Sequence, residues 1–386
     1  MSAMHTPNLP IATDTPLSWL GGLTSREFLR DYWQKRPLYI PNAFPGFSDL
    51  LTREQLLAYA RQEDVISRLV QRGEGDDWQL EHGPFTAKQL NRLPAEGWAL
   101  LVQNLNHLLP TADALLQHFS FVPYARLDDL MISYAPDGGG VGPHYDSYDV
   151  FLLQGSGSKE WQISVDGDRS LIPDIPLRIL SNFQAEQRWL LQPGDMLYLP
   201  PHCAHYGIQR GAGTTYSIGF RTPSHQELAS QFLMFLAEKV DLPGMYADPT
   251  LAAQAQPGQL DPLMLQQCTA LLQQVRWGEA DVADFLCSYL SAPKQHVWFD
   301  EPARPVSETT FAKRAQAQGL QLDRRSLCLY HAGAVWLNGE PAPEGLQQHP
   351  LLRALADHRA LAAQPMSADV LDWLYEGYCA GFIHLV

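Results

Sequence analysis

The sequence has few cysteines, and none of them is placed to build a covalent or metal framework. Its 386 residues include five cysteines, an odd number, and no two of them form a C-x-x-C pair. This pattern excludes a disulfide-stapled fold and a zinc ribbon, and it is typical of a reducing compartment. The cysteines are Cys203, Cys268, Cys287, Cys328 and Cys379.

Long apolar runs are also lacking. No stretch approaches the roughly 20 residues that a membrane-spanning helix needs. The first twenty residues, MSAMHTPNLPIATDTPLSWL, show no basic start followed by an apolar core, so we expect no secretory signal peptide. The expectation is therefore a cytoplasmic protein with no membrane segment.

Positive charge is scarce. Lys and Arg number 27 against 42 Asp and Glu, which gives a net charge of −15. This balance disfavours a sequence-independent nucleic-acid binder, whose affinity comes from cations that neutralise phosphates. It suits a basic partner through electrostatic steering, although solubility alone is the simpler reading of the same number.

The length predicts two or three domains at about 150 residues each. Residues 1–16 are polar and rich in proline, and we expect them to be disordered. Two capping-box sequences, Thr24 with Glu27 and Thr52 with Gln55, predict amphipathic helices immediately after them. These helices are expected to precede the main fold.

Short runs of strand-forming residues follow from about residue 97 to Ser224. They include LMISYA, DVFLLQ, EWQISV, DMLYLP and TTYSIGF, with turn-forming residues nearby. Several strands without intervening helices predict a sandwich or barrel rather than βαβ units.

The remaining chain consists of two segments with different sequence patterns. Residues 226–292 carry broad apolar stripes at helical spacing, with more Leu, Phe and Met than one thin layer needs, so these helices should pack on each other, on the barrel or on a second copy. Residues 293–386 predict a helix, a strand–turn–strand and two more helices, similar to a winged-helix module. Residues 301–386 contain seven Lys/Arg against nine Asp/Glu, a net of −2, which weighs against DNA binding.

One segment has the spacing of a metal site. His144 and Asp146 follow the glycine-rich stretch 138–142, and on an extended chain residues two apart point to one face. A lone His-x-Asp is a weak signal, but Pro193–His205 adds a tight turn, a strand and a second turn that would bring another histidine onto the same point. We prefer His205 as that ligand and assign His202 to the turn, although the turn geometry could reverse the two.

His144, Asp146 and His205 would form a two-histidine, one-carboxylate set. Such a set leaves three positions of an octahedral ion open, as in non-haem Fe(II) oxygenases. Zinc is the rival metal, but a structural zinc site wants four protein ligands, usually with cysteine. Cys203 should lie on the opposite strand face as a small apolar residue.

Lys159 is a candidate for holding an organic cosubstrate. It lies fifteen residues after His144, behind the turn GSGS and at the start of EWQISV. If DVFLLQ and EWQISV form a hairpin inside the barrel, its ammonium can point inward and bind the distal carboxylate of 2-oxoglutarate. The alternative is a solvated turn lysine.

Four stretches together resemble a known family. FLRDYWQKRPLYIPNAFP, GGGVGPHYDSYDVFLLQGSGSKEWQI, PGDMLYLPPHCAHYG and TTYSIGFRTP are similar to the JmjC-type bacterial ribosomal oxygenases, which hydroxylate an arginine of large-subunit ribosomal protein L-sixteen. The resemblance implies an α+β fold with a double-stranded β-helix (cupin/JmjC jelly-roll) barrel. The implied divisions are a disordered 1–16, a catalytic domain at 17–225 with N-terminal helices, a helical dimerisation segment at 226–292 and a winged-helix domain at 293–386.

The same resemblance assigns roles to residues. His144, Asp146 and His205 match the iron ligands, and Lys159 stands where the family holds 2-oxoglutarate. Some members add a serine at the position of Ala135 here, so Ser133, Tyr134 or Ser217 would have to substitute, or Lys159 acts alone. A cationic target needs acidic or aromatic lining, for which Asp149, Tyr148 and Asp137 are the candidates.

The leading hypothesis is a homodimeric protein hydroxylase that uses Fe(II), 2-oxoglutarate and O2. By resemblance it hydroxylates the β-carbon of an arginine in a basic ribosomal protein, which the acidic surface would recruit. One alternative is a histidine-directed ribosomal oxygenase. Another is a non-catalytic protein that binds ribosomes or rRNA and keeps a vestigial metal site.

Overall fold

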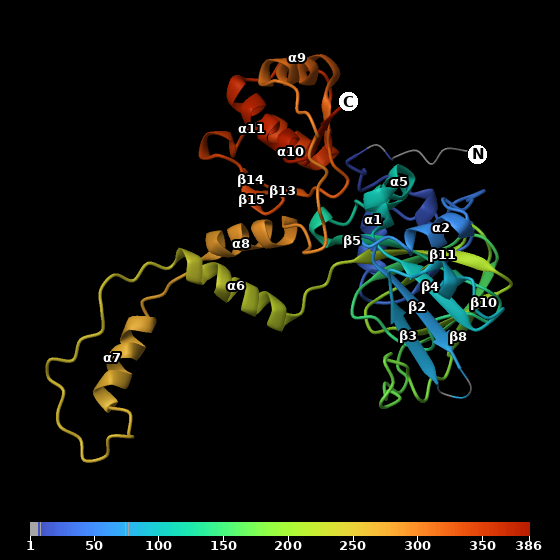
Figure 1. Cartoon of the computed structure of the whole chain (residues 1–386), viewed down its shortest axis with the longest axis horizontal. Helices are drawn as coiled ribbons and strands as arrows, with labels where there is room; N and C mark the ends of the chain where they lie inside the picture. The colour runs from blue at the N-terminus through green and yellow to red at the C-terminus, as the bar shows by residue number, and fades with distance from the viewer. Residues whose placement is uncertain (1–6, 8, 74, 76) are drawn as a thin grey trace. The chain divides into compact units, whose positions relative to one another are not determined.

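The computed structural model forms two compact units (Figure 1). No helix of the described residues is long and apolar enough to cross a membrane. The division into two units does not test the domain limits expected from the sequence, which remain predictions. The structure describes residues 7, 9–73, 75 and 77–386. The first unit comprises Met1–Thr222, Lys294–Ser326 and Asp357–Val386, and the second comprises Pro223–Pro293 and Leu327–Ala356.

Side-chain caps start three N-terminal helices of the first unit. Thr24, Thr52 and Thr86 each accept a hydrogen bond from the backbone N–H three residues further on, and the side chain there accepts one from the N–H of the cap residue. Such caps satisfy N–H groups that a helix start leaves free. The two helices predicted from their capping boxes are thus confirmed. The elements are η1 (Ser18–Leu20), α1 (Ser25–Asp31), α2 (Arg53–Tyr59) and α3 (Ala87–Leu90).

The segment 1–16, expected to be disordered, is described only in part. Residues 1–6 and 8 lie outside the described residues. In the rest of the segment, Asp14 forms an ion pair with Arg26 at 2.7 Å, and Pro16 makes a β-bridge with Thr24. These contacts attach the end of the segment to α1.

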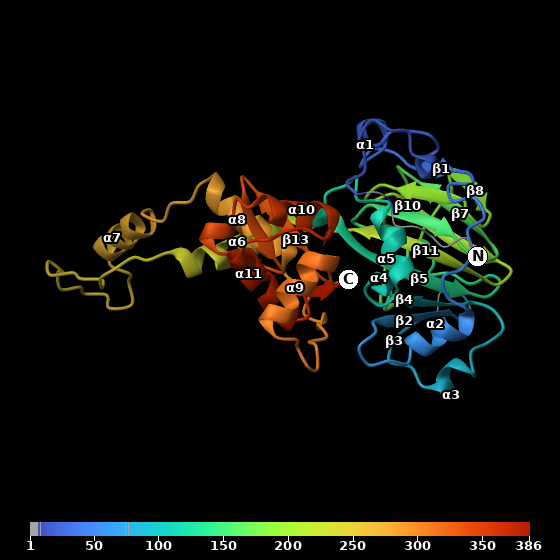
Figure 2. The ribbon, with the colours of Figure 1, turned by 90° about the horizontal axis from the view of Figure 1, so that it is seen from above.

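An eight-stranded antiparallel sheet forms the larger wall of a barrel in the first unit (Figure 2). Every residue of its strands VFLLQ and MLYL is buried, as expected for strands covered on both faces. In sheet order the strands are β1 (Leu38–Ile40), β9 (Met196–Leu199), β6 (Val150–Gln154), β11 (Gly213–Phe220), β5 (Leu127–Ala135), β4 (Trp98–Val102), β2 (Ser67–Arg72) and β3 (Trp78–His82).

A three-stranded sheet packs on the inner face of this wall. Leu152 of β6 and Leu197 of β9 meet Trp161 in an apolar cluster between the sheets, whereas their neighbours Phe151 and Tyr198 enter a second cluster on the outer face. Because successive side chains alternate along a strand, each strand serves both clusters. The predicted barrel is therefore confirmed. The strands of the smaller sheet are β10 (Ala204–Arg210), β7 (Ser158–Ser164) and β8 (Gln187–Leu191).

The rest of the first unit covers the outer face of the wall and forms a small sheet of its own. Leu115 and Leu116 of α5 enter the outer apolar cluster. The C-terminal strands form the sheet β16-β12-β17. The elements are α4 (Leu105–Leu108), α5 (Pro110–Gln117), η2 (Tyr124–Arg126), α9 (Glu308–Gln318), β12 (Leu320–Leu322), β16 (Ala360–Leu361), α11 (Ala368–Cys379) and β17 (Ile383–Leu385).

Aromatic rings hold two helices of the second unit together. The ring centroid of Phe285 in α8 lies 5.4 Å from that of Phe232 and 5.7 Å from that of Phe235, both in α6. By contrast, α7 has no buried residue. The predicted strand–turn–strand is present as the β13–β14 hairpin. The elements are α6 (His225–Lys239), α7 (Pro262–Leu272), α8 (Glu279–Ser291), β13 (Cys328–His331), β14 (Ala334–Leu337), β15 (Glu340–Pro341), η3 (Glu344–Leu346) and α10 (Pro350–His358), whose last two residues belong to the first unit.

A buried carboxylate joins the N-terminal region to the large sheet. The Asp149 side chain is fully buried. It accepts hydrogen bonds from the Tyr198 hydroxyl at 2.6 Å and from the Gln34 side-chain amide at 2.9 Å, and Arg126 lies 3.6 Å from it. These partners offset the cost of burying its charge.

Replacing Asp149 by alanine should therefore destabilise the fold. The buried Tyr198 hydroxyl would lose its acceptor and Arg126 its counter-charge, so we expect the free energy of unfolding to fall by about 3 kcal/mol. Asp149→Asn keeps an acceptor for Tyr198 and should cost about 1 kcal/mol. Urea unfolding of both variants checks this, and an alanine variant as stable as the parent would contradict it.

Candidate metal centre

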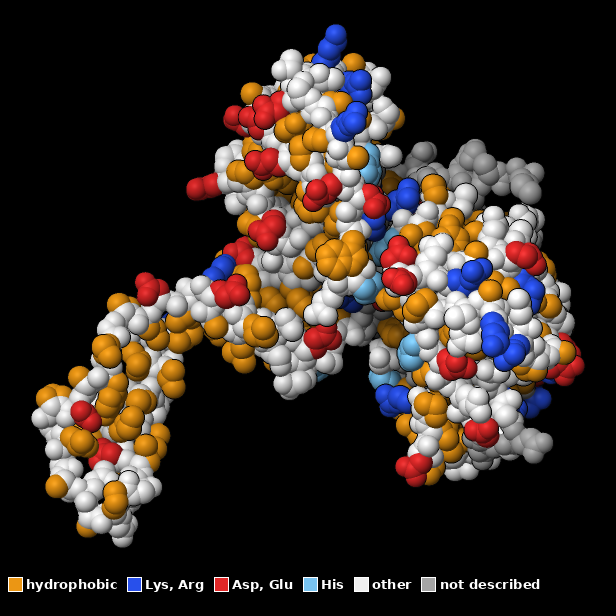
Figure 3. Space-filling model, viewed as in Figure 1, with side chains coloured by type: hydrophobic (Ala, Val, Ile, Leu, Met, Phe, Trp, Pro, Cys, Tyr) orange, Lys and Arg blue, Asp and Glu red, His pale blue; other side chains and the backbone are white. Residues whose placement is uncertain are grey.

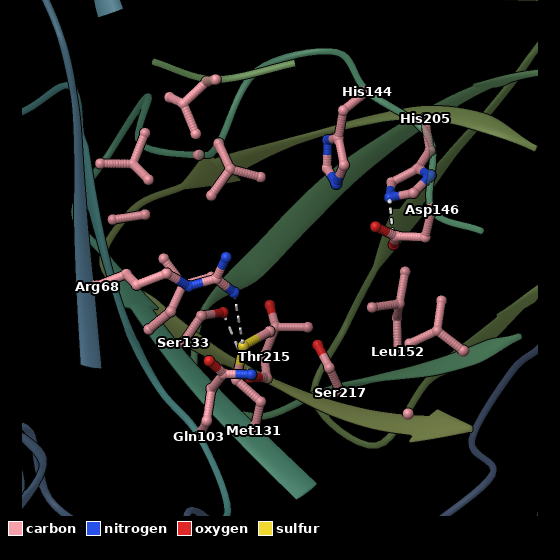
Figure 4. A pocket seen from close by; sticks show the side chains of 18 of the residues that line it. Arg68, Gln103, Met131, Ser133, His144, Asp146, Leu152, His205, Thr215 and Ser217 are labelled. Carbon is pink, nitrogen blue, oxygen red and sulfur yellow. Dashed lines mark hydrogen bonds and ion pairs between the residues drawn. The ribbon is translucent and has the colours of Figure 1, made fainter. Parts of the chain in front are cut away.

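Three side chains converge at one end of the barrel. His144 precedes β6, and His205 is on β10; their backbones form a β-bridge in which the N–H of each residue donates to the carbonyl of the other, at 2.9 and 2.7 Å. Asp146 completes the group, and one ligand atom from each of the three lies within 4.8 Å of the others. Figure 4 shows the imidazoles of His144 and His205 and the Asp146 carboxylate side by side.

Both imidazoles are oriented for coordination. The Nδ1 atom of His144 lies 2.9 Å from the Gly142 carbonyl, and that of His205 lies 2.9 Å from the Cys203 carbonyl. A carbonyl only accepts, so Nδ1 carries the proton in each ring and Nε2 keeps a free lone pair. Burial and the neighbouring His144 lower the pKa of His205 to about 4, so its ring is neutral at pH 7.

This donor set fits a divalent iron ion. Two neutral imidazole nitrogens and one carboxylate can occupy one face of an octahedral ion and leave the rest for other ligands. Cys203 does not contribute a sulfur ligand, because it is buried in the cluster between the sheets and burial raises the pKa of its thiol to about 12. A closed zinc site with cysteine is therefore not formed by these residues.

His202 lies in the turn before β10, not in the group. Its φ of 63° belongs to the left-handed region, and its side chain is exposed. Its backbone N–H donates to the Asp146 carbonyl at 2.7 Å, so the turn supports the segment that carries the carboxylate.

A pocket of about 460 Å³ opens from the three residues between the two sheets. Lys159 of β7 points into it and is only 7% exposed. Its ammonium donates to the Thr215 hydroxyl at 3.2 Å and lies 4.7 Å from the Trp161 ring centroid. Among the described residues no carboxylate forms an ion pair with Lys159, and burial lowers its pKa to about 8. The pocket therefore offers an anion a buried cation that the protein itself leaves uncompensated.

Close packing leaves no room for a side chain on β10 beside Lys159 and Trp161. Gly207 of β10 pairs with Trp161 of β7. A Cβ atom at Gly207 would lie 2.6 Å from Cε of Lys159 and 2.7 Å from the Trp161 ring. Only glycine fits this position, and the lysine stem passes over it into the pocket.

Hydroxyl groups beside Lys159 come mainly from β11. Thr215 and Ser217 line the pocket, and Ser133 of β5 lines it as well, with its hydroxyl 3.4 Å from the Thr215 carbonyl. Tyr134 lies on the opposite face of the strand. Its ring centroid is 5.6 Å from that of Trp98, and it is not part of the pocket lining. Sequence reasoning missed Thr215, although the alternation in TTYSIGF places it on the same face as Ser217.

The acidic lining is not the one expected from the sequence. Asp149 points into the outer face of the sheet, where Tyr198 and Gln34 bind it, and Asp137 lies on an exposed loop and accepts a hydrogen bond from the Gly211 N–H at 2.7 Å. Neither lines the pocket, whereas Tyr148 does. Asp149 fails as a candidate because it is adjacent to Tyr148, and adjacent residues of an extended segment face opposite ways.

Asp128 and Asp129 are the carboxylates of β5 in the pocket lining; Asp128 is already paired with Lys294, so Asp129 supplies the negative charge. Both line the pocket at the start of β5, and Asp129 is 8% exposed. Burial and the adjacent Asp128 raise the pKa of Asp129 to about 6. The sequence signal for Asp129 was its place in LDDLMISYA, where Asp129, Met131 and Ser133 stand two apart and share one strand face. Arg68 of β2 also reaches into the pocket, with Nη2 4.0 Å from the Met131 sulfur (Figure 4).

Two family models match the chain. A JmjC domain matches residues 114–228 and includes His144, Asp146, Lys159 and His205. A ROXA-like winged helix matches residues 270–384.

Curated relatives agree with these models. The chain is 31% identical over 340 residues to the ribosomal protein uL16 3-hydroxylase of Escherichia coli, covering 88% of this chain and 90% of that protein. It is 40% identical over 209 residues to a probable ribosomal oxygenase of Haemophilus influenzae, covering 53% and 52% of the two chains. A bifunctional lysine-specific demethylase and histidyl-hydroxylase NO66 of Aedes aegypti is 26% identical over 195 residues, which cover 46% of this chain and 30% of that protein.

Solved structures show the same fold. The X-ray structure of E. coli YcfD matches with a TM-score of 0.82 at 30% identity, over 94% of this chain and 98% of that one. The structure of YcfD, a ribosomal oxygenase, in complex with cobalt and 2-oxoglutarate matches with a TM-score of 0.79 at 30% identity over the same shares. The chain therefore belongs to the JmjC-domain ribosomal oxygenases, enzymes that depend on Fe(II), 2-oxoglutarate and O2.

Proposed function

We propose that this enzyme hydroxylates the β-carbon of an arginine in the large-subunit ribosomal protein uL16. The observation that carries the proposal is the buried Asp129 in the same pocket as His144, Asp146 and His205. A carboxylate in this place can pair with a guanidinium while the carbons next to it reach the metal centre. The E. coli relative that is a uL16 3-hydroxylase supports the choice of substrate.

His144, Asp146 and His205 are the residues that would hold the iron. The carbonyls of Gly142 and Cys203 fix the ring tautomers, so the two Nε2 atoms are presented without rearrangement. Bound there, iron with 2-oxoglutarate and O2 supplies the oxidation that replaces a C–H bond of the substrate by a C–OH bond.

Lys159 and Thr215 would bind the far carboxylate of 2-oxoglutarate. The ammonium is already positioned by its hydrogen bond to Thr215 and by the Trp161 ring. A carboxylate in the pocket restores charge balance, which makes the contact strong in a buried setting. Ser133 and Ser217 offer further hydroxyl donors on the same pocket wall.

Asp129 would orient the substrate side chain. Its carboxylate is held by the Asn104 backbone N–H at 3.1 Å. A guanidinium can satisfy its remaining acceptor positions with paired N–H groups. Apolar side chains, among them Leu101 and Leu152, line the rest of the pocket and exclude water from the reacting carbon.

The decisive experiment is a mass measurement on recombinant uL16. Incubation with the enzyme, Fe(II), 2-oxoglutarate and air should add about 16 Da to a single peptide, at an arginine. Asp146→Ala should abolish the shift, because two neutral ligands hold iron poorly without the carboxylate.

Other results would redirect or end the proposal. A histidine-containing ribosomal peptide modified in a parallel assay, with uL16 unchanged, would favour the histidine-directed alternative, which the likeness to a histidyl-hydroxylase motivates. No modification by an iron-loaded, folded enzyme, with equal 2-oxoglutarate turnover in the parent and Asp146→Ala, would favour a non-catalytic ribosome- or rRNA-binding role.

The low pKa of Lys159 predicts a pH dependence of cosubstrate binding. A carboxylate binds only the charged ammonium, so binding raises this pKa from about 8. Below pH 7 the free lysine is already charged and affinity should be nearly constant; above pH 8 binding must take up a proton, and affinity should fall up to tenfold per pH unit. Calorimetric titration of the cobalt-loaded enzyme with 2-oxoglutarate between pH 6.5 and 9.5 measures this.

Two variants isolate the role of the ammonium. Lys159→Arg keeps a charge that does not titrate in this range, so its affinity should lack the decline above pH 8. Lys159→Met should weaken binding at least a hundredfold at pH 7, about 2.7 kcal/mol. Lys88→Met, at an exposed lysine of α3, serves as the control. An identical decline in Lys159→Arg would assign the titration to another group.

We also infer that the enzyme is a homodimer through α6 and α7. These helices expose apolar side chains in the second unit, including Leu233 and Leu272, which are 63% and 67% exposed. Figure 3 shows hydrophobic side chains crowded over α7. Exposed apolar side chains gathered on one surface are typical of a protein–protein interface. We infer a second copy of the chain as the partner, because most soluble oligomers are homo-oligomers.

Charge placed in this face should separate the subunits. Leu265→Glu with Leu272→Glu should convert a dimer to a monomer in light scattering after gel filtration, because burying two carboxylates is costly. Leu190→Glu changes a similarly exposed leucine, 50% exposed, on β8 and should leave the dimer intact. A dimeric double variant would contradict this interface.

The proposed substrate sets location and partners. A ribosomal protein is met in the cytoplasm, where we place the enzyme. No role for DNA is proposed, since the winged-helix region carries a net charge of −2 over residues 301–386.

A further inference from the structure

A cationic cluster stands next to the metal centre: Tyr145 and Arg178 line the pocket, and Arg169 contacts the Tyr145 ring from outside that lining. Tyr145 lies between His144 and Asp146 in the chain, and two guanidinium groups lie close to its ring. The Cζ atoms of Arg169 and Arg178 each lie 5.6 Å from the ring centroid. Arg178 also donates to the Tyr145 hydroxyl at 3.2 Å. Arg169, Tyr145 and Arg178 are called the arginine clamp below.

The loop that carries the two arginines is tied to the metal centre. Leu171 and Leu180 form a β-bridge, so Arg169 and Arg178 stand on the two arms of one antiparallel loop. The N–H of Leu180 donates to the Pro143 carbonyl at 2.8 Å, immediately before His144. The clamp is thus connected to the backbone of the ligand segment.

The clamp carries two positive charges without acidic partners. Arg169 and Arg178 are both exposed, and none of the described carboxylates forms an ion pair with either. The adjacent Asp168 already accepts hydrogen bonds from Ser170 and Asn182. Arg169 also donates to the His202 carbonyl at 3.4 Å, but no described carboxylate neutralises either arginine, so both charges can pair with an anion from outside the chain.

We propose that the arginine clamp binds a carboxylate of the protein substrate, carried by an acidic residue close in sequence to the hydroxylated one. The inference rests on the proposed function. A purely basic segment would be repelled by two uncompensated cations next to the metal centre, whereas a segment with one acidic residue would pair with them. The clamp thus selects among basic substrates.

Geometry limits how far the carboxylate lies from the target. Tyr145 is one residue from each of two metal-binding candidates, so its Cα is about 3.8 Å from theirs. A substrate strand advances about 3.3 Å per residue, so six positions span about 20 Å, and we expect the acidic residue within that span of the target. A polypeptide is favoured over nucleic acid, because the chain as a whole carries a net charge of −15 and would repel phosphates.

The first test separates affinity from chemistry. Arg169→Gln with Arg178→Gln should raise KM for uL16 about tenfold, since two exposed charge pairs are lost. The kcat and the affinity for 2-oxoglutarate should stay unchanged, because the clamp does not touch the cosubstrate. Arg188→Gln, at an exposed arginine of β8 that does not line the pocket, is the matched control and should leave KM unchanged.

The second test identifies the partner on the substrate. Acidic residues within six positions of the hydroxylated residue are replaced one at a time by their amides. One replacement should raise KM about tenfold with the parent enzyme and have no effect with the double variant, which is the signature of a direct pair in a double-mutant cycle.

The outcomes distinguish the clamp from the function itself. Product formation by the parent with an unchanged KM in the double variant overturns the clamp and leaves the proposed function standing. Absence of product from uL16 overturns the function, and fluorescence anisotropy with labelled uL16 then judges the clamp: equal binding by both enzymes refutes it. If the double variant loses binding to a large-subunit rRNA fragment but binds uL16 as the parent does, the clamp binds phosphate, and the proposal is also refuted.

Discussion

The candidate metal centre depends on two reciprocal backbone hydrogen bonds between His144 and His205. The bonds, at 2.9 and 2.7 Å, hold the glycine-rich segment against β10. The approach is so close that a Cβ at Gly140 would lie 2.3 Å from the Gly207 carbonyl oxygen. Because the bridge positions both histidines, it also positions Tyr145 and Asp146, which follow His144 directly. The metal ligands and the arginine clamp therefore share one backbone support.

The pocket has a buried lysine and a buried carboxylate in its lining, and no ion pair joins the two. Burial lowers the pKa of Lys159 to about 8 and raises that of Asp129 to about 6. A ligand of opposite charge stabilises the ionised form in each case, so the pocket is matched to an anionic cosubstrate at one side and a cationic side chain at the other. Burial keeps both contacts in a medium where charge pairs are strong.

Local sequence patterns predicted the roles of residues that depend only on their spacing along the chain. His144 and Asp146 stand two apart on extended chain, and the capping boxes at Thr24 and Thr52 predicted their helices. Residues whose role depends on strand pairing were missed or misplaced. Thr215 reaches Lys159 only because β11 and β7 lie across one pocket, and Asp149 is lost to the outer face by a single step of the strand alternation.

By itself the sequence determined the family, the barrel and the set of groups able to bind iron, because these follow from motifs and periodicities that are local in the chain. The tertiary structure decided which carboxylates face the pocket, which hydroxyl meets Lys159 and where Arg169 and Arg178 meet Tyr145. Those contacts join segments from 24 to 56 residues apart in the numbering of this chain, from Tyr145–Arg169 to Lys159–Thr215. No local pattern encodes a side chain's partner at that separation, since strand register and sheet order first have to bring the segments together.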